Sequence, residues 1–323
     1  MSDALVNSLN SIVAATTPLV IASIGETITE RAGVINLSLN GSILLAAMAG
    51  FAAAQTSNSV IIGIGVAAMI GAVIALIIAF SAIELRRDQV AIGFVLTILT
   101  ADLATFLGKP YVNMPGPRIP NMPIPLLSDI PVVGRIFFDH DLMVYFSFAL
   151  VIISWYWMFH TRHGLALRAV GENPQAAFAR GTKVNQQRYI YTILGGALVG
   201  VAGAAYSLSV KAGWFANPPM DGDGWIALAI VIFGGWHPFR VILGAYLFAV
   251  LRRVVADLQS TVDFPLVLLN TLPWVLMILT LMMVSSGTLE RLTRLLPVRL
   301  QRQFRNVLRS DPPAAIGTRF DKN

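Results

Sequence analysis

The sequence has no cysteine and few charged residues. Of its 323 residues, 12% are charged and 56% are hydrophobic, and the mean hydropathy is +0.70. Without cysteine the chain has neither disulfides nor thiolate metal ligands, and its four histidines lack metal-like spacing. A G-x-x-x-x-G-K-[ST] loop, which would hold nucleotide phosphates, is also missing. We therefore expect no metal, no cofactor and no ATPase site in this chain.

What the sequence does contain is a succession of long apolar segments. A helix needs about 17 to 25 such residues to cross roughly 30 Å of hydrocarbon, and its backbone groups are then satisfied internally. The alternating segments of a membrane barrel are absent. The sequence predicts an all-α polytopic membrane protein with about eight to ten transmembrane helices, including a broken or re-entrant segment at the seventh and eighth. The predicted spans are residues 8–28, 38–55, 60–82, 90–107, 141–160, 189–209, 224–236, 240–255 and 264–285.

Positive charge is concentrated on one side of this topology. If the termini lie on opposite sides, most of the 23 lysines and arginines fall in Arg31, the turn 84–88, residues 161–188, Arg240 and the tail after residue 287. The positive-inside rule makes that side cytoplasmic, so we expect an external N-terminus and a cytoplasmic C-terminus. This distribution explains the net charge of +6 without a nucleic-acid partner.

The chain is predicted to divide into a transmembrane domain, residues 1–287, and a basic cytoplasmic tail, residues 288–323. Repeated arginines with few acids are typical of a segment that lies against anionic lipid headgroups. On the external side, the loop 108–140 contains seven prolines, which fix φ and remove amide donors, so we expect it to be irregular but stiff. Such a loop could receive a partner or serve only as a connection.

One polar stretch, GENPQAAFARG at residues 171–181, has the signals of a short capped helix on the cytoplasmic side. Asn173 suits the N-cap, Pro174 the first helical position and Gly181 the C′ position. Barely two turns lie between them, and a helix this short is marginal alone in water. We therefore expect it to be held by the membrane surface or by a second protein.

Three segments together resemble a known family. TRHGLALRAVGENPQAAFARGTKVNQQRY resembles the cytoplasmic coupling segment, here residues 161–188, of permease subunits of ATP-binding-cassette (ABC) importers. These belong to the family that takes up simple sugars, nucleosides and branched-chain amino acids. ETITERAGVINLSLNGSILLAAMAG resembles the family's first motif in its nucleoside-type form, and GDGWIALAIVIFGGWHPFRVILGAYLFAVL resembles its late glycine-rich motif. The order of the matches makes residues 1–287 the expected permease domain.

The resemblance implies a transport subunit, not an enzyme, in the inner membrane of a bacterium. This subunit would move a small polar solute inward, with nucleosides ahead of simple sugars and branched-chain amino acids. The implied partners are two ABC ATPase subunits that hold ATP and Mg, a second permease chain of the same or another kind, and an external solute-binding protein. The capped helix would be the rigid lever to the ATPase. The residues implied in coupling are Arg168, Gly171, Glu172, Asn173, Pro174, Phe178, Arg180 and Gly181.

Polar residues interrupt the apolar sequence between the first two spans. Amides and hydroxyls at membrane depth are unfavourable unless they face a cavity or one another. We place Asn36, Ser38 and Asn40 near the translocation path, where they would hydrogen-bond ribose or base edges, with helix-to-helix contact as the structural alternative. Glu30 and Arg31 are expected to pair at the cytoplasmic edge.

The fourth span departs from the family pattern. Related nucleoside permeases often have Asn where this chain has Thr97, and Asp102 follows five residues later. We include both in the candidate substrate path, although Asp102 could instead pair with Lys109. Asp102 and Glu26 also leave open a proton-coupled secondary transporter. An intramembrane enzyme is disfavoured because the sequence has no H-E-x-x-H or G-x-S-x-G motif.

Overall fold

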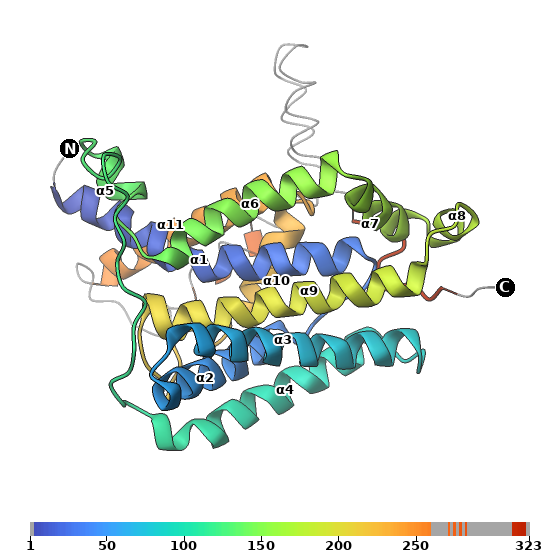
Figure 1. The fold of residues 1–323 in the computed structure, drawn as a ribbon, viewed down its shortest axis with the longest axis horizontal. Coiled ribbons are helices and arrows are strands. Elements are labelled where there is room, and N and C mark those ends of the chain that lie inside the picture. Colours follow the sequence, from blue (N-terminus) through green and yellow to red (C-terminus); the bar gives the residue numbers. More distant parts are fainter. Residues whose placement is uncertain are drawn as a thin grey trace, which may run out of the picture.

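The computed structural model is a bundle of membrane-length helices (Figure 1). It describes residues 3–259 and 312–320, together with positions 271, 274, 275, 278, 279 and 282. Within this part of the chain, six helices are long and apolar enough to cross a membrane. They are α1 (Asp3–Arg31), α2 (Leu39–Ser57), α3 (Val60–Ile83), α4 (Gln89–Gly108), α6 (Leu142–His160) and α9 (Val184–Ala205).

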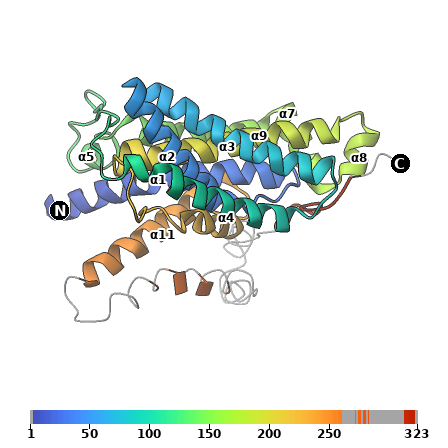
Figure 2. The ribbon, with the colours of Figure 1, turned by 90° about the horizontal axis from the view of Figure 1, so that it is seen from below.

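Shorter elements connect and complete the bundle. The helices α7 (Arg162–Glu172) and α8 (Pro174–Ala179) lie together at one end, and η2 (Tyr206–Val210) continues α9 as a π-helical turn. The helix α10 (Asp223–Phe233) has only 11 residues and is followed by α11 (Pro238–Gln259), which runs obliquely to the main bundle (Figure 2). At about 1.5 Å per residue, α10 is roughly 16 Å long, about half the membrane thickness.

These elements confirm the all-α prediction and the first six predicted spans, whose boundaries agree within a few residues. The seventh and eighth predicted spans coincide with α10 and α11, which are helices but are not among the six that are long and apolar enough to cross a membrane. The predicted broken segment is also confirmed, because α10 ends at Phe233 and a turn at 234–237 separates it from α11. The ninth predicted span, 264–285, lies outside the described residues apart from six single positions. The same holds for the predicted basic tail, 288–323, except for residues 312–320. The predicted division into domains therefore stays a prediction.

Small residues allow α9 to pack in the centre of the bundle. A Cβ atom added at Gly196 would lie 2.6 Å from the backbone oxygen of Gly71 on α3. On the neighbouring face, a Cβ atom at Gly195 would lie 2.5 Å from the backbone oxygen of Gly25 on α1. Side chains at these positions would not fit, so α9 contacts both α1 and α3 through its backbone.

The segments predicted to share one side of the membrane do lie at one end of the bundle. Arg31, at the end of α1, forms an ion pair of 3.5 Å with Glu172 at the end of α7. The Tyr189 hydroxyl at the start of α9 donates to a carboxylate oxygen of Glu84, in the α3–α4 turn, at 3.5 Å. The predicted grouping is therefore confirmed for Arg31, the turn 84–88 and residues 161–188, whereas most of the tail after residue 287 lies outside the described residues. We call this the coupling end; Figure 1 shows α7 and α8 there, opposite the N-terminus.

The proline-rich loop lies at the opposite end. It is largely irregular, as predicted, but it also contains a 3-10 turn (Lys109–Tyr111) and the five-residue helix α5 (Val133–Phe137), which the sequence analysis did not predict. Arg135 on α5 pairs with Asp3 at 3.3 Å. The loop is therefore attached to the N-terminal turn of α1.

Candidate functional site

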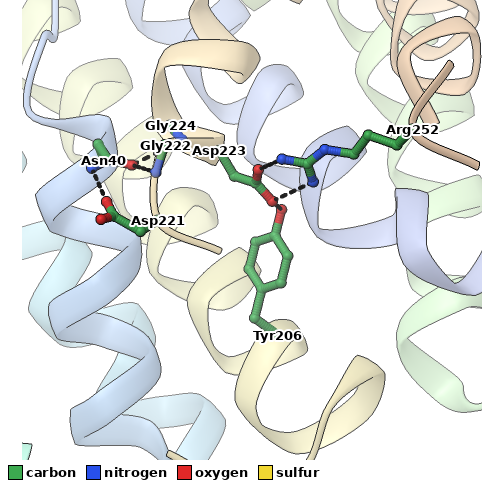
Figure 3. Close-up of polar contacts among 7 residues, drawn as sticks. All are labelled: Asn40, Tyr206, Asp221, Gly222, Asp223, Gly224 and Arg252. Atoms are coloured by element: carbon green, nitrogen blue, oxygen red, sulfur yellow. Dashed lines mark hydrogen bonds and ion pairs between the residues drawn. The ribbon is translucent and has the colours of Figure 1, made fainter. Parts of the chain in front are cut away.

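A buried polar cluster surrounds the N-terminus of α10. The Asn40 side-chain oxygen, from α2, accepts hydrogen bonds from the backbone N–H groups of Gly222 at 2.8 Å and Gly224 at 3.4 Å (Figure 3). Its amide nitrogen donates to the Asp221 carboxylate at 2.9 Å. Asn40 thus supplies from another helix the cap that the first turn of α10 requires. We call this set of contacts the α10 cap.

Asp223, the first residue of α10, is buried beside this cap. Its carboxylate accepts hydrogen bonds from the Tyr206 hydroxyl on η2 and from both terminal nitrogens of Arg252 on α11, one of them at 3.2 Å (Figure 3). The Arg252 guanidinium also lies 4.9 Å from the Phe248 ring centre. A buried carboxylate is tolerated only when paired and hydrogen-bonded in this way.

The position of the cap and the Asp223 pair follows from the length of α10. Its last turn reaches the coupling end, so its N-terminus lies roughly 16 Å away, near mid-membrane depth. Half-helices whose N-termini end at this depth form ligand sites in transporters, because their free N–H groups carry partial positive charge. The sequence analysis included Asn40 here but missed Tyr206, Asp223 and Arg252, which come from three separate elements.

The remaining residues of the predicted inner motif bond mainly to one another. The Asn36 side-chain oxygen accepts from the backbone N–H of Ser38 at 3.0 Å and from its hydroxyl at 2.6 Å. The Ser38 and Ser42 hydroxyls are 3.0 Å apart, and the Asn36 backbone N–H donates to Glu26 at 3.2 Å. Most of these bonds lie within the motif itself, and the bond to Glu26 attaches it to α1, so within the described part of the chain the Asn36 and Ser38 side chains do not join one helix to another. A role in binding solute stays a prediction.

The two candidates on α4 are separated by the structure. Thr97 is buried, and its hydroxyl donates to the Leu37 backbone oxygen at 2.8 Å, which joins α4 to the inner motif. Asp102 lies on the exposed face of α4, away from that motif. The Lys109 ammonium lies 5.5 Å from the Phe106 ring centre, on the same helix end. Thr97 is therefore placed with the inner motif, whereas Asp102 is not.

At the coupling end, the structure confirms the predicted caps of α8. The Asn173 side-chain oxygen accepts from the Ala176 N–H at 2.9 Å, Pro174 is the first helical residue, and Gly181 has a φ of +87° just beyond the C-cap. A second helix, α7, precedes it, which the prediction of a single short helix missed. Thr161 caps α7 by accepting from the Gly164 N–H at 3.1 Å.

Close contacts fix α7 against the end of α1. Gly171 is buried, and a Cβ atom there would lie 2.2 Å from the Arg31 backbone oxygen. Arg31 pairs with Glu172 and donates from Nε to the Trp236 backbone oxygen at 3.1 Å. Glu30 accepts from the Trp236 indole N–H. The expected pairing of Glu30 with Arg31 is wrong, because each has a partner on another segment.

The exposed part of the coupling segment is the tip formed by α8. Phe178 is 44% exposed, which is unusual for an aromatic side chain outside the membrane, and Arg180 beside it is also exposed. Arg168 differs from the expectation of a contact at this tip, since its guanidinium packs over the Phe159 ring at 4.9 Å. The tip therefore presents an aromatic ring flanked by positive charge.

Comparison with known proteins places this arrangement in a family. Residues 8–286 match the family described as branched-chain amino acid transport system, permease component. The chain belongs to this permease family. Its members are membrane subunits of ABC transporters and lack an ATPase site of their own. The permease is accordingly a multi-pass membrane protein of that transporter class, and its family implies ATPase and solute-binding partners in general.

Several relatives match over most of their length. The permease is 38% identical over 256 residues, 78% of each chain, to a putative glucose ABC transporter permease protein, TsgC13, of Haloferax volcanii. It is 34% identical to the nucleoside ABC transporter permease protein NupC of Lactococcus lactis, over 86% of this chain and 93% of that one. It is 33% identical to the guanosine ABC transporter permease protein NupQ of Bacillus subtilis, over 86% and 92%. No solved structure matches the permease.

The turn between α10 and α11 carries a histidine with altered acidity. Burial, together with the nearby charges of Arg240 and Arg31, lowers the pKa of His237 to about 4. The ring packs 4.9 Å from the Phe159 ring. In the permease His237 is therefore neutral near pH 7 and serves as a packing residue at the coupling end.

The opposite end of the permease contains a polar cavity of about 460 Å³. This volume lies in the usual range of small-molecule sites. One of the cavity's lining residues, Asp141, caps α6 and accepts from the Ser209 hydroxyl on η2. The polar lining residues of the cavity are Asn10, Arg118, Asn121, Asp139, His140, Asp141 and Ser209. The sequence analysis did not predict this cavity, because its lining comes from four distant segments.

Proposed function

We propose that the permease is the membrane subunit of an ABC importer that moves nucleosides inward across the cytoplasmic membrane of a bacterium. Two partner ATPase subunits bind and hydrolyse ATP with Mg, a second permease chain completes the membrane part, and an external binding protein delivers the solute. The N-terminus faces outward and the coupling end faces the cytoplasm, in line with the positive-inside rule.

The observation that carries this proposal is the exposed, doubly capped α8 at the basic end of the bundle. Six residues form a stable helix there because Asn173 and Gly181 satisfy its ends, and because Gly171 packs α7 against α1. An ATPase that moves α8 would move α7 with it as one body. The Phe178 ring is the apolar contact available for that partner.

A continuous set of contacts leads from α8 to the α10 cap. Glu172 pairs with Arg31, and Arg31 holds the backbone oxygen of Trp236 in the turn that follows α10. Displacement of this turn would displace α10 along its axis and disturb the bonds at its N-terminus near mid-membrane depth. A movement that the ATPase imposes on the coupling end would thereby change which polar groups of the α10 cap are available to a solute.

The choice of nucleosides is supported by the extent of the similarities. The relatives named for nucleoside and guanosine transport match over 92% or more of their own length. The relative named for glucose is more identical, but the match covers 78% of it. Simple sugars are therefore the second candidate, and both solutes carry the hydroxyls that polar side chains at this depth would bind.

The proposal is tested by uptake in the native host with and without the permease. We expect loss of labelled guanosine uptake in the deletion strain, with glucose uptake unchanged, and restoration by the wild-type gene. Loss of glucose uptake alone would replace nucleosides by sugars. Phe178→Ala is expected to abolish restored uptake while the amount of permease in the membrane stays constant.

A second experiment distinguishes an ABC importer from a proton-coupled transporter by the energy source that uptake requires. Uptake through an ABC importer stops when ATP is depleted and persists when a protonophore removes the proton gradient at constant ATP. The reverse result would refute the importer and direct attention to Glu26, which is buried in α1. Asp102 is less suited to that rival role, because it lies on the exposed face of α4.

A further inference from the structure

The C-terminal segment of the chain returns to the coupling end. Residues 312–320, which we call the C-terminal strap, lie beside α7 and α8, and Figure 1 shows them close to both helices. Pro313 and Ala315 are buried in this position. The strap is therefore packed into the fold and is not merely adjacent to it.

Backbone hydrogen bonds hold the strap on both sides. The Ala315 N–H donates to the Gly171 backbone oxygen at 2.8 Å, and the Gly317 N–H donates to the Gly33 backbone oxygen at 3.0 Å. A Cβ atom at Gly33 would lie 3.2 Å from the Ala315 oxygen, so a larger residue there would crowd the strap. Both acceptors are glycines that also join α1 to the coupling segment.

A buried cation explains why the strap stays in place. Arg188, on α9, is 3% exposed and donates from Nη1 to the Thr318 backbone oxygen at 2.9 Å. Without the strap this guanidinium would lose that partner, and a buried charge without partners is strongly unfavourable. Because of this contact, we expect the strap to stay bound to the bundle when an ATPase binds.

The last described residue of the strap extends the exposed tip of α8. The Phe320 ring lies 5.6 Å from the Phe178 ring, at an interplanar angle of 59°, and packs on the apolar cluster formed by Val170, Ala177 and Val184. Such tilted pairs are a favourable aromatic arrangement. The two rings form one apolar surface contributed by segments 142 positions apart in the sequence.

We propose that the C-terminal strap is part of the ATPase docking surface, with Phe320 and Phe178 acting as a paired apolar anchor. This inference rests on the proposed function. Arg180 and Arg319, both exposed, flank the two rings. A partner that fits is an ATPase subunit with an apolar cleft bordered by acidic residues, since aromatic anchors in a desolvated pocket carry most of an interface's binding energy.

The test uses the whole transporter, purified through a tagged permease with its own ATPase subunits. Phe320→Ala leaves the backbone bonds of the strap intact, whereas deletion of 312–323 would also remove the partner of Arg188. We expect Phe320→Ala to weaken ATPase retention and solute-stimulated hydrolysis by about tenfold, as when an apolar anchor is truncated. Phe320→Leu is expected to restore much of the loss. Leu85→Ala, at an exposed apolar position in the α3–α4 turn of the same end, is the matched control and should have no effect.

Because the chain has no cysteine, a single introduced cysteine can be labelled to measure whether the ATPase covers the strap. A single Phe320→Cys should react with maleimide in the isolated permease and be protected when the ATPase is bound. Normal retention and hydrolysis in Phe320→Ala, with loss in Phe178→Ala, would overturn the role of the strap and leave the proposed function intact. Normal behaviour of both variants would overturn the coupling assignment itself. Increased hydrolysis in Phe320→Ala would show that the strap obstructs docking, which also overturns the proposal.

Discussion

Replacement of Asn40 by Ala tests whether this residue holds α10 or binds solute. The residue is 7% exposed, and its side-chain oxygen accepts from the N–H groups of Gly222, the N-cap residue of α10, and of Gly224 in the first turn. Loss of an N-cap costs about 0.5–2 kcal/mol, and a buried donor left unpaired costs about 1–3 kcal/mol. We therefore expect the first turn of α10 to be destabilised by about 2 kcal/mol. This corresponds to a roughly thirtyfold larger equilibrium population of the open form of that turn, and amide exchange that proceeds through the open form should accelerate accordingly.

Hydrogen–deuterium exchange with mass spectrometry measures this directly, on peptides that cover residues 222–226. Thr56→Ala is the matched control, since Thr56 is an exposed residue of the same helix whose hydroxyl bonds only to backbone oxygens of α2. Unchanged exchange in Asn40→Ala would refute the capping argument. If that variant instead raised the Michaelis constant for uptake with unchanged exchange, Asn40 would be a solute contact, as the sequence first suggested.

Three further predictions concern packing, charge and pH. Gly171→Ala places a methyl group against the Arg31 backbone oxygen and should sharply lower the amount of folded permease, whereas Gly65→Ala on α3, where a Cβ atom would meet no neighbour, should keep it. Arg252→Gln leaves Asp223 buried without its cation and should lower the free energy of unfolding by about 3–5 kcal/mol, seen as a lower melting temperature. Adding Asp223→Asn to the same chain should recover part of that loss. His237 has a pKa of about 4 in the fold against its usual 6.5, so its contribution to stability is complete above about pH 6.5 and lost as the pH falls toward 4.

Each of these has a simple measurement. Fluorescence-detected gel filtration quantifies folded permease for the two glycine variants, and equal amounts of both would contradict the argument from close packing. Thermal melts at a fixed detergent concentration compare the charge variants; a double variant no better than the single one would show that the buried carboxylate is not the cause. For the pH effect, melts at pH 7 and pH 5 should differ less in His237→Gln than in the wild type.

Most of the fold could be predicted because its signals are local. A span is identified by the hydropathy of its own residues, and the caps of α8 by Asn173, Pro174 and Gly181 within nine positions. The broken seventh span was also predictable from its adjacent glycines. These features depend on backbone chemistry that is complete within one segment.

The candidate site was less predictable because its contacts are long-range. Asn40 bonds to residues 182 and 184 positions away, and a single sequence does not indicate that pairing. Asp102 was considered for the substrate path because it is a charge within a span, but hydropathy does not define which face of a helix points inward. Arg252 is also a charge within a predicted span, 240–255, but nothing in the sequence pairs it with Asp223 or with the Tyr206 hydroxyl.

The glycine contacts of α9 determine which parts of the permease can move independently. Backbones that touch without intervening side chains cannot slide past one another by rotamer changes, because there are no rotamers at the contact. We therefore expect α1, α3 and α9 to remain together as one rigid body during transport. By contrast, α10 and α11 pack on α1 through apolar side chains, which can change rotamers, and their ion pair, Asp223–Arg252, joins them to each other. We therefore expect α10 and α11 to move relative to the other three helices.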